Sequence, residues 1–222
     1  MRATKAAREC GEEALRQLQE IGDERGVLRA QKLLARTALE DGRPEEAAEG
    51  FAQVVRGAEA LGDETMRTEA YLGLARARLA QGRMRGLFRA LEEARRDLAL
   101  AAQSPVALEW DALDLVRSIR RRQFAEVPGG IKKLKAGLRR WDTRRLTAEC
   151  LALCGFELVR HNRLAEAAPV REDALEAAAQ PDAVAWTEQF LATARTVDVR
   201  QWITSLVTEV HGRTKVEGSS WT

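Results

Sequence analysis

The 222-residue sequence lacks several features that mark whole classes of protein. No uninterrupted apolar run approaches the ~20 residues that a membrane-spanning helix needs. The N-terminal stretch MRATKAARECGEEAL is too charged for a secretory signal. Lys and Arg number 36 against 34 Asp and Glu, which argues against a dedicated nucleic-acid-binding protein. Aromatic residues make up only 5% of the chain, so there are few side chains on which the bases of single strands could stack.

Residues that would carry chemistry are also scarce. His161 and His211 are the two histidines, and neither has a nearby Cys, Asp or Glu at the spacing of metal ligands. The three cysteines are an odd number at irregular spacing, which indicates a reducing compartment. Cys150 and Cys154 share one helix face, and we interpret them as small apolar packing residues. We therefore expect a cytoplasmic protein with no catalytic residues, no metal and no cofactor.

What the sequence does contain is a repeat of 40 residues. LARTALEDGRPEEAAEGF begins at Leu34, and LARARLAQGRMRGLFRAL begins at Leu74. GDERG and GDETM start 40 residues apart as well, at Gly22 and Gly62. The same interval reaches Arg122-Gln123 and Asn162-Arg163 with weaker identity. A regular interval of this length is typical of stacked structural repeats.

Each repeat predicts two helices separated by short turns. One apolar stripe has the i, i+4, i+7 spacing of an amphipathic helix: Ala47, Phe51, Val54, Ala58 and Leu61. Residues suited to cap a helix N-terminus recur between the stripes, at Asp23, Asp63, Ser104, Asp142 and Asp182. No segment shows the two-residue alternation of a strand. Because one hairpin cannot bury its own apolar face, we predict an all-α solenoid of about four stacked hairpins.

At these residues the chain resembles the tetratricopeptide repeats. The first repeat offers Leu34, Ala35, Gly42, Ala47, Phe51 and Val54, and the second offers Tyr71, Leu74, Ala75, Gly82, Leu87, Leu91 and Ala94. The period is longer than the family's usual ~34 residues. It is similar to the arrays of bacterial signal-responsive regulators and kinesin light chains. The resemblance implies a superhelix whose first helices line a concave surface that binds partner proteins or peptides.

The predicted organisation has four parts. They are an N-terminal capping or unpaired helix (1–21), four repeats in 22–181 (22–61, 62–102, 103–141 and 142–181), a degenerate capping hairpin (182–211) and a flexible tail (212–222). The N-terminal helix either caps the array, pairs with a second copy, or belongs to a longer array. Val127-Pro128-Gly129-Gly130 stands where the third repeat's second helix should begin, and we expect a late or distorted start there.

The family's groove positions give a candidate peptide-binding surface. Mapped onto this chain they are Arg29, Lys32, Arg36, Glu69, Arg76, Val116, Arg120, Ala152, Phe156 and Arg160. The set is basic at one end and apolar at the other, which favours an acidic partner segment with an apolar anchor. The Asn of the family's carboxylate clamp has no counterpart here, so we do not predict recognition of a chaperone C-terminus.

A second candidate surface is a basic ridge in the third repeat. Eleven basic and four acidic residues between Asp111 and Ala148 give 11 − 4 = +7, which leaves 2 − 7 = −5 for the rest of the chain. The ridge residues are Arg121, Arg122, Lys132, Lys133, Arg139, Arg140, Arg144 and Arg145. Such density could steer nucleic acid or an acidic protein, or provide internal salt bridges on a solvated face. We place Trp141 on the buried side of this helix.

The leading hypothesis is a non-catalytic scaffold that binds a protein or peptide in the concave groove, in a bacterial regulatory system. One alternative is a nucleic-acid-associated protein that uses the basic ridge. The other alternative is a module for homo-oligomerisation through the N-terminal helix.

Overall fold

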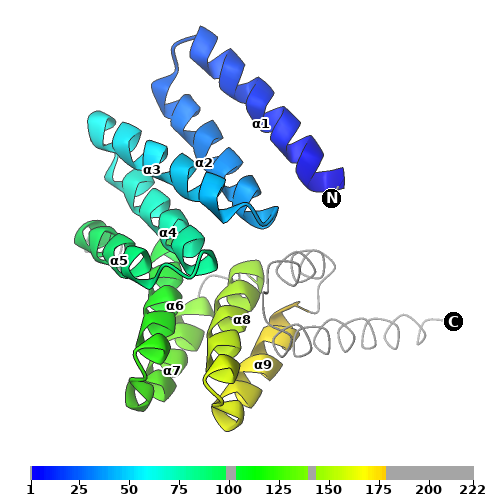
Figure 1. Ribbon diagram of the computed structural model, residues 1–222, viewed down its shortest axis with the longest axis vertical. Helices are drawn as coiled ribbons and strands as arrows, with labels where there is room; N and C mark the ends of the chain where they lie inside the picture. The colour runs from blue at the N-terminus through cyan, green and yellow to red at the C-terminus, as the bar shows by residue number, and fades with distance from the viewer. Residues whose placement is uncertain (1, 99–103, 140–143, 179–222) are drawn as a thin grey trace, which may run out of the picture. The chain divides into compact units, whose positions relative to one another are not determined.

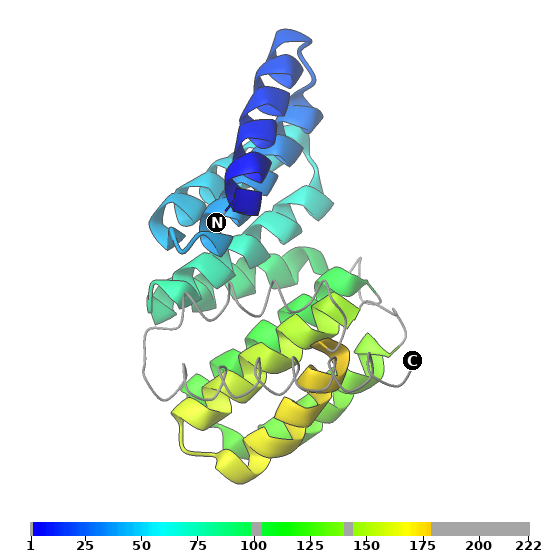
Figure 2. The ribbon, with the colours of Figure 1, turned by 90° about the vertical axis from the view of Figure 1, so that its right-hand side faces the viewer.

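The computed structural model describes residues 2–98, 104–139 and 144–178. Within these ranges the chain is helical apart from short turns, and it contains no strand, so the predicted all-α class is confirmed (Figures 1 and 2). The helices are α1 (Arg2–Glu20), α2 (Glu24–Glu40), α3 (Pro44–Leu61), α4 (Glu64–Ala80), α5 (Met84–Leu98), α6 (Pro105–Arg120), the 3₁₀ helix η1 (Phe124–Glu126), α7 (Val127–Leu138), α8 (Arg144–Arg160) and α9 (Leu164–Ala178).

The chain divides into two compact units. Unit 1 is Met1–Val106 and unit 2 is Ala107–Thr222, so the boundary falls within the first turn of α6. Because of this division, the stacking of hairpins that the sequence predicts is described inside each unit separately.

None of the described helices combines the length and the apolar character that crossing a bilayer requires.

In unit 1 each helix packs against the next one along the chain, from α1 to α5 (Figure 1). The first helices of the two repeats, α2 and α4, also touch, and Lys32 forms an ion pair with Glu69 between them. Phe51 of α3 is 3% exposed and packs in a core cluster whose other buried members are alanines. Alanine lets helices approach closely, and the single large ring fills the space between them.

In unit 2 the helices α6 to α9 share a core of large aliphatic side chains. Leu113 and Ile119 of α6, Leu134 of α7 and Leu158 of α8 are each fully buried. The Sγ atom of Cys154 on α8 lies 3.7 Å from the carbonyl oxygen of Ala112 on α6, so these two helices are in close contact. The last two helices, α8 and α9, pack along one another.

The inner turns repeat with the period that the sequence predicts. Gly42 and Gly82 have φ of 74° and 72°, and the residues at the next two 40-residue steps, Arg122 and Asn162, have φ of 60° and 58°. All four turns therefore use the left-handed conformation, although only the first two contain glycine. The 40-residue period is a property of the backbone even where residue identity has been lost.

Arg122 is a place where this backbone geometry is unfavourable. A side chain with a Cβ atom pays roughly 1–2 kcal/mol in the left-handed region, and glycine pays nothing. We expect Arg122→Gly to raise the free energy of unfolding of unit 2 by roughly 0.5–1 kcal/mol. Asn162→Gly should gain less, because asparagine tolerates this conformation. Urea unfolding measures both, and a loss of stability in Arg122→Gly would contradict the positive φ.

The helix caps agree with the sequence where they are described. The side chains of Asp23 and Asp63 accept hydrogen bonds from the backbone N–H groups of Gly26 and Met66, each at 2.9 Å. Ser104 directly precedes α6. The remaining predicted caps, Asp142 and Asp182, lie outside the described residues.

The predicted late or distorted start of the third repeat's second helix is confirmed, because the second helices of the other repeats begin at Pro44, Met84 and Leu164, and the same interval would start this one at Phe124. The chain enters this helix through the 3₁₀ turn η1, and α7 begins at Val127, with Pro128 in its first turn. Both glycines are therefore helical. A Cβ atom on Gly130 would lie 2.2 Å from Cδ2 of Leu115, so glycine at this position allows α7 to pack closely on α6.

The N-terminal helix α1 packs against α2, as a cap would. A Cβ atom on Gly11 would lie 2.8 Å from Cδ2 of Leu34, which indicates a close contact between the two helices. Ile21, at the end of the predicted apolar stripe, is 76% exposed. The predicted capping hairpin 182–211, the tail 212–222 and Trp141 lie outside the described residues.

Candidate functional site

In unit 1 the predicted groove residues lie on the two first helices, α2 and α4. Arg29 and Arg36 are exposed on α2, and Arg36 donates from Nε to Oε1 of Glu40 at 3.0 Å. Lys32 pairs with Glu69 across the contact between the two helices, and Arg76 is half-buried about two turns further along the same face of α4. This face therefore alternates in charge, and the basic end that the sequence predicts is partly neutralised.

In unit 2 one predicted groove residue is placed wrongly. Val116 is fully buried, because α6 turns Leu108, Ala112, Val116 and Ile119 toward the core. The prediction rested on the family alignment, which assigns Val116 to the groove-lining face of α6.

The other groove residues of unit 2 surround a buried carboxylate. Arg120 of α6 donates from Nη2 to Oε1 of Glu157 on α8 at 2.6 Å, and the Glu157 side chain is 1% exposed. Arg160 is exposed, with Nη1 3.9 Å from the same oxygen. Ala152 and Phe156 are half-buried. The ion pair of Arg120 with Glu157 therefore links α6 to α8.

One residue of the basic ridge is paired within the fold, since Nζ of Lys133 on α7 lies 3.0 Å from Oδ1 of Asp111 on α6. Lys135, which is on the same helix but outside the ridge, pairs with Asp173 on α9, with Nζ 2.5 Å from Oδ2. Lys132 on α7 and Arg139 directly after that helix are exposed, and Arg121 and Arg122 are exposed at the turn after α6. Arg140 and the side chains of Arg144 and Arg145 lie outside the described residues.

His161, at the turn between α8 and α9, contacts an aromatic ring. Its ring stands edge-on to Phe124 of η1, with the ring centroids 6.0 Å apart, and the guanidinium carbon of Arg163 lies 4.7 Å from the Phe124 centroid. Burial lowers the pKa of His161, the Glu157 carboxylate opposes this in part, and nearby arginines again lower it. The neutral imidazole thus packs the turn between α8 and α9 against η1.

The interpretation of Cys150 and Cys154 as packing residues agrees with their burial. Both are fully buried on α8, and burial raises the pKa of the Cys154 thiol to about 12. At neutral pH this thiol stays protonated, so it is a poor nucleophile and a poor metal ligand. Within the described ranges, no three His, Cys, Asp or Glu side chains converge to hold a metal ion.

Unit 1 also contains a groove of about 720 Å³ that none of the predicted sites includes. Its lining comes from α4, α5 and the turn between them: Tyr71, Leu74, Arg78, Arg83, Met84, Arg85, Gly86, Arg89, Ala90 and Glu93. We call it the α4–α5 groove. Successive helical residues are rotated by 100°, so Tyr71, Leu74 and Arg78 lie on the opposite side of α4 from Glu69 and Arg76. The groove and the predicted peptide face are therefore separate surfaces.

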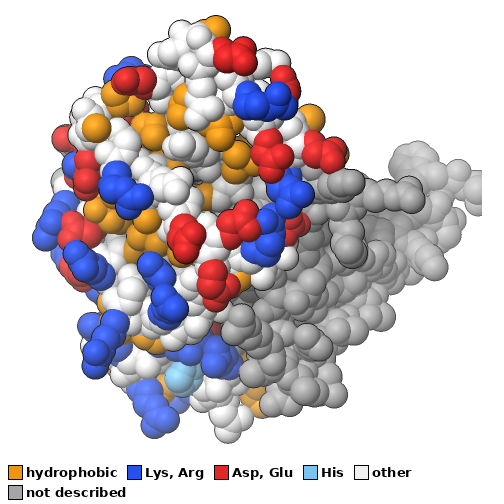
Figure 3. Space-filling model, turned by 45° about the horizontal axis from the view of Figure 1, so that its top comes forward, with side chains coloured by type: hydrophobic (Ala, Val, Ile, Leu, Met, Phe, Trp, Pro, Cys, Tyr) orange, Lys and Arg blue, Asp and Glu red, His pale blue; other side chains and the backbone are white. Residues whose placement is uncertain are grey.

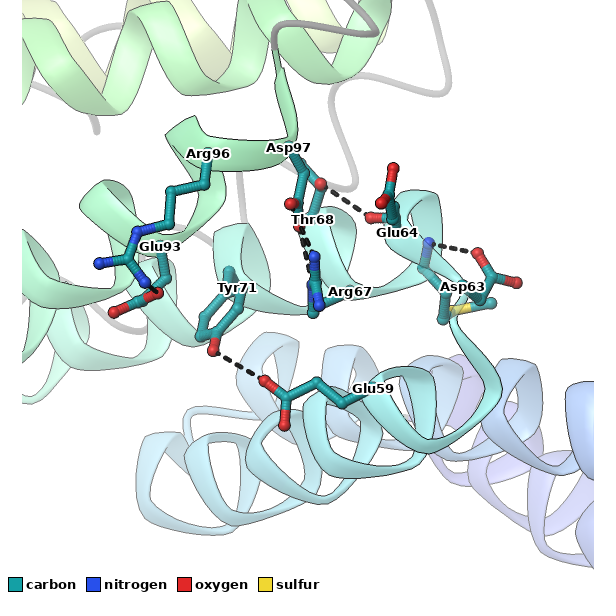
Figure 4. Close-up of polar contacts among 10 residues, drawn as sticks. Glu59, Asp63, Glu64, Arg67, Thr68, Tyr71, Glu93, Arg96 and Asp97 are labelled. Atoms are coloured by element: carbon teal, nitrogen blue, oxygen red, sulfur yellow. Dashed lines mark hydrogen bonds and ion pairs between the residues drawn. The ribbon is translucent and has the colours of Figure 1, made fainter.

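The Tyr71 end of the α4–α5 groove is tied to its neighbours by polar contacts (Figure 4). The Tyr71 hydroxyl donates to Oε1 of Glu59 on α3 at 3.4 Å. Arg67, one turn earlier on α4, makes two hydrogen bonds to Asp97 on α5, at 2.8 and 2.7 Å. Glu93 pairs with Arg96 on the same helix. These contacts fix α3, α4 and α5 against one another and place the carboxylates of Glu59 and Glu93 at this end of the groove.

The sequence does carry a signal for this groove. Between Ala70 and Leu91 there is no Asp or Glu, and five arginines stand at 76, 78, 83, 85 and 89. The longer basic segment of the third repeat dominates the charge pattern of the chain and masks this shorter one. On the face shown in Figure 3 acidic and basic side chains are mixed over the upper part, and Lys and Arg predominate toward the bottom.

Comparisons with known proteins point to the fold alone. No family model matches the chain, and no curated protein matches it either. Among solved structures, it is similar to the crystal structure of BtubC (BKLC) from P. vanneervenii, with a TM-score of 0.61 and 15% identity. The similarity covers 99% of this chain and 94% of that one. A likeness at this identity indicates a related helical architecture, and fold by itself does not establish function.

Proposed function

We propose that the protein is a non-catalytic interaction scaffold that binds a segment of a partner protein along the first helices of its hairpins. The observation that carries the proposal is the adjacency of α2 and α4 in unit 1, which Lys32 and Glu69 tie together. Arg29 and Arg36 stand exposed beside this pair. A surface with fixed backbones and alternating charges suits an extended or helical peptide.

The regulatory setting of the proposal rests on the resemblance to long-period bacterial arrays. Under this proposal the chain docks a peptide and couples it to an effector, and it performs no chemistry itself. Two alternatives have less support. The ridge residue Lys133 is already paired within the fold, which weakens the case for nucleic acid. The α1 helix packs on α2, which leaves less of its apolar stripe for a second copy.

The test is selection of peptides from a random display library on the full chain. The affinity of each enriched peptide is then measured by isothermal titration calorimetry. Arg29→Glu and Arg36→Glu together should weaken binding about tenfold or more, because two favourable charge contacts become repulsive.

Arg56→Glu is the matched control, since Arg56 is exposed on α3 and lies outside the predicted face. The affinity of this variant for the peptide should stay within about twofold of that of the unmodified protein. Failure to enrich any peptide, or equal losses in the control and the double variant, would refute binding on this face.

A further inference from the structure

The α4–α5 groove has a charge that its counterpart in the first repeat does not share. Forty residues before Arg85 and Arg89 stand Glu45 and Glu49, on the corresponding helix α3. The fold at these positions is therefore compatible with either sign of charge. Since helix formation and packing do not require arginine here, the cluster in the second repeat needs another explanation.

None of the groove's four arginines has a carboxylate partner within the described part of the chain. Arg83, Arg85 and Arg89 are exposed, whereas Arg78 donates to Oε1 of Gln81 at 2.9 Å. Elsewhere in unit 1 some arginines are paired, as Arg67 is with Asp97, and others, such as Arg56, are exposed without a carboxylate partner among the described residues, so what distinguishes the groove is that it gathers such arginines on one surface. Unpaired guanidinium groups that share one concave surface repel one another and are available to an anion that enters it.

Apolar groups lie beside these cations. Tyr71 and Leu74 of α4 and Met84 of α5 line the groove and are half-buried. Gly86 adds no side chain, and a Cβ atom there would lie 3.0 Å from Cδ of Arg78. The groove can therefore take an aliphatic side chain next to carboxylates, which is the composition of an acidic peptide with a hydrophobic residue.

The other end of the groove limits how far an anion can extend. Glu93 lines it, and Glu59 approaches it through Tyr71. A nucleic-acid backbone carries a charge at every nucleotide, so a strand that followed the groove would meet these carboxylates. A peptide can place its acidic residues at the arginines and neutral or basic residues beyond them.

We propose that the α4–α5 groove is a second docking site, which binds an acidic peptide segment of a partner through Arg83, Arg85 and Arg89. Arginine is suited to this role because its planar fork matches a carboxylate with two parallel hydrogen bonds. The site lies on the opposite side of α4 from the face proposed above, so either site can be absent without affecting the other.

The probe is a short fluorescein-labelled peptide of Asp, Glu and Leu, titrated with the full chain and followed by fluorescence anisotropy. A peptide with Lys in place of each acid, and a single-stranded oligonucleotide of equal negative charge, serve as comparisons. We expect the acidic peptide to bind, the basic one not to bind, and the affinity to fall as the salt concentration rises.

Two double variants that change the net charge of the protein by the same amount, one inside the groove and one outside it, test whether the position of the arginines matters. Arg85→Glu with Arg89→Glu should weaken the acidic peptide at least tenfold. Arg56→Glu with Arg95→Glu changes the net charge equally at exposed positions outside the groove, and should weaken it less than threefold. Circular dichroism checks that each variant is folded. If the double variant Arg85→Glu with Arg89→Glu is unfolded, Arg85→Gln with Arg89→Gln takes its place.

Three results would overturn the proposal. The first is absence of measurable binding by the acidic peptide. The second is an equal loss in the two double variants, which would indicate a diffuse effect of net charge. The third is tighter binding of the oligonucleotide, lost in the groove variant, which would assign the groove to nucleic acid.

Discussion

Replacing Arg120 with methionine is expected to lower the free energy of unfolding of unit 2 by about 3 kcal/mol, since removing one partner of a buried ion pair typically costs 3–5 kcal/mol. The Glu157 side chain is 1% exposed, and Arg120 supplies its hydrogen bond from Nη2 at 2.6 Å. Without that guanidinium the carboxylate stays buried beside α6. Arg160 offsets part of the loss, but its Nη1 atom is 3.9 Å away and its side chain is 41% exposed.

Tryptophan fluorescence isolates this effect, because all five tryptophans lie in unit 2, at positions 110, 141, 186, 202 and 221. The urea midpoint followed by fluorescence should fall in Arg120→Met. Combining Arg120→Met with Glu157→Leu should restore most of the stability, since apolar pairs of similar volume often replace buried ion pairs at little cost. A single variant as stable as the parent, or a double variant no better than the single, would contradict this account of the pair.

This ion pair shows why part of the site could not be predicted from the sequence. The helices and their turns follow from local information: Asp23 and Asp63 cap helices, and Gly42 and Gly82 occupy left-handed turns. The pairing of Arg120 with Glu157, by contrast, joins residues 37 apart in sequence. The family alignment predicted that Arg120 lines the groove, because an alignment identifies which face of a helix a residue lies on. It carries no information about which charged side chains form ion pairs between helices.

Errors of register have a similar origin. Val116 and Leu115 are both largely buried, since α6 contacts helices on two sides. Apolar spacing alone does not distinguish such a helix from one with a single buried face. The late start expected from the low helix propensity around Gly129 and Gly130 is found, since α7 begins at Val127 after the 3₁₀ turn η1, although both glycines are themselves helical. The α4–α5 groove could have been found from the sequence, through the absence of acids between Ala70 and Leu91.

Gly73→Ala is expected to destabilise unit 1 by roughly 1–3 kcal/mol, although alanine favours helices. Gly73 lies in the middle of α4, and a Cβ atom there would lie 2.2 Å from Cε1 and 2.5 Å from Cδ1 of Phe51. The Phe51 ring is 3% exposed and packs among the alanines of α3 and its neighbours, so it has no free space into which to rotate. The added methyl group must push α3 and α4 apart, which costs more than the helix propensity gains.

Gly129→Ala is the matched control, because Gly129 is also helical and nothing lies within 4 Å of the Cβ atom that it would gain. Here the helix propensity acts alone, so stability should rise by a few tenths to about 1 kcal/mol. Gly73 lies in unit 1 and Gly129 lies in unit 2, so far-UV circular dichroism and tryptophan fluorescence together distinguish the effects of the two substitutions. In Gly73→Ala the far-UV circular dichroism should show a transition at lower urea while the tryptophan transition stays in place. In Gly129→Ala the tryptophan transition should move to higher urea, and a loss of stability there would mean that α7 is packed more tightly around Gly129 than its surroundings indicate.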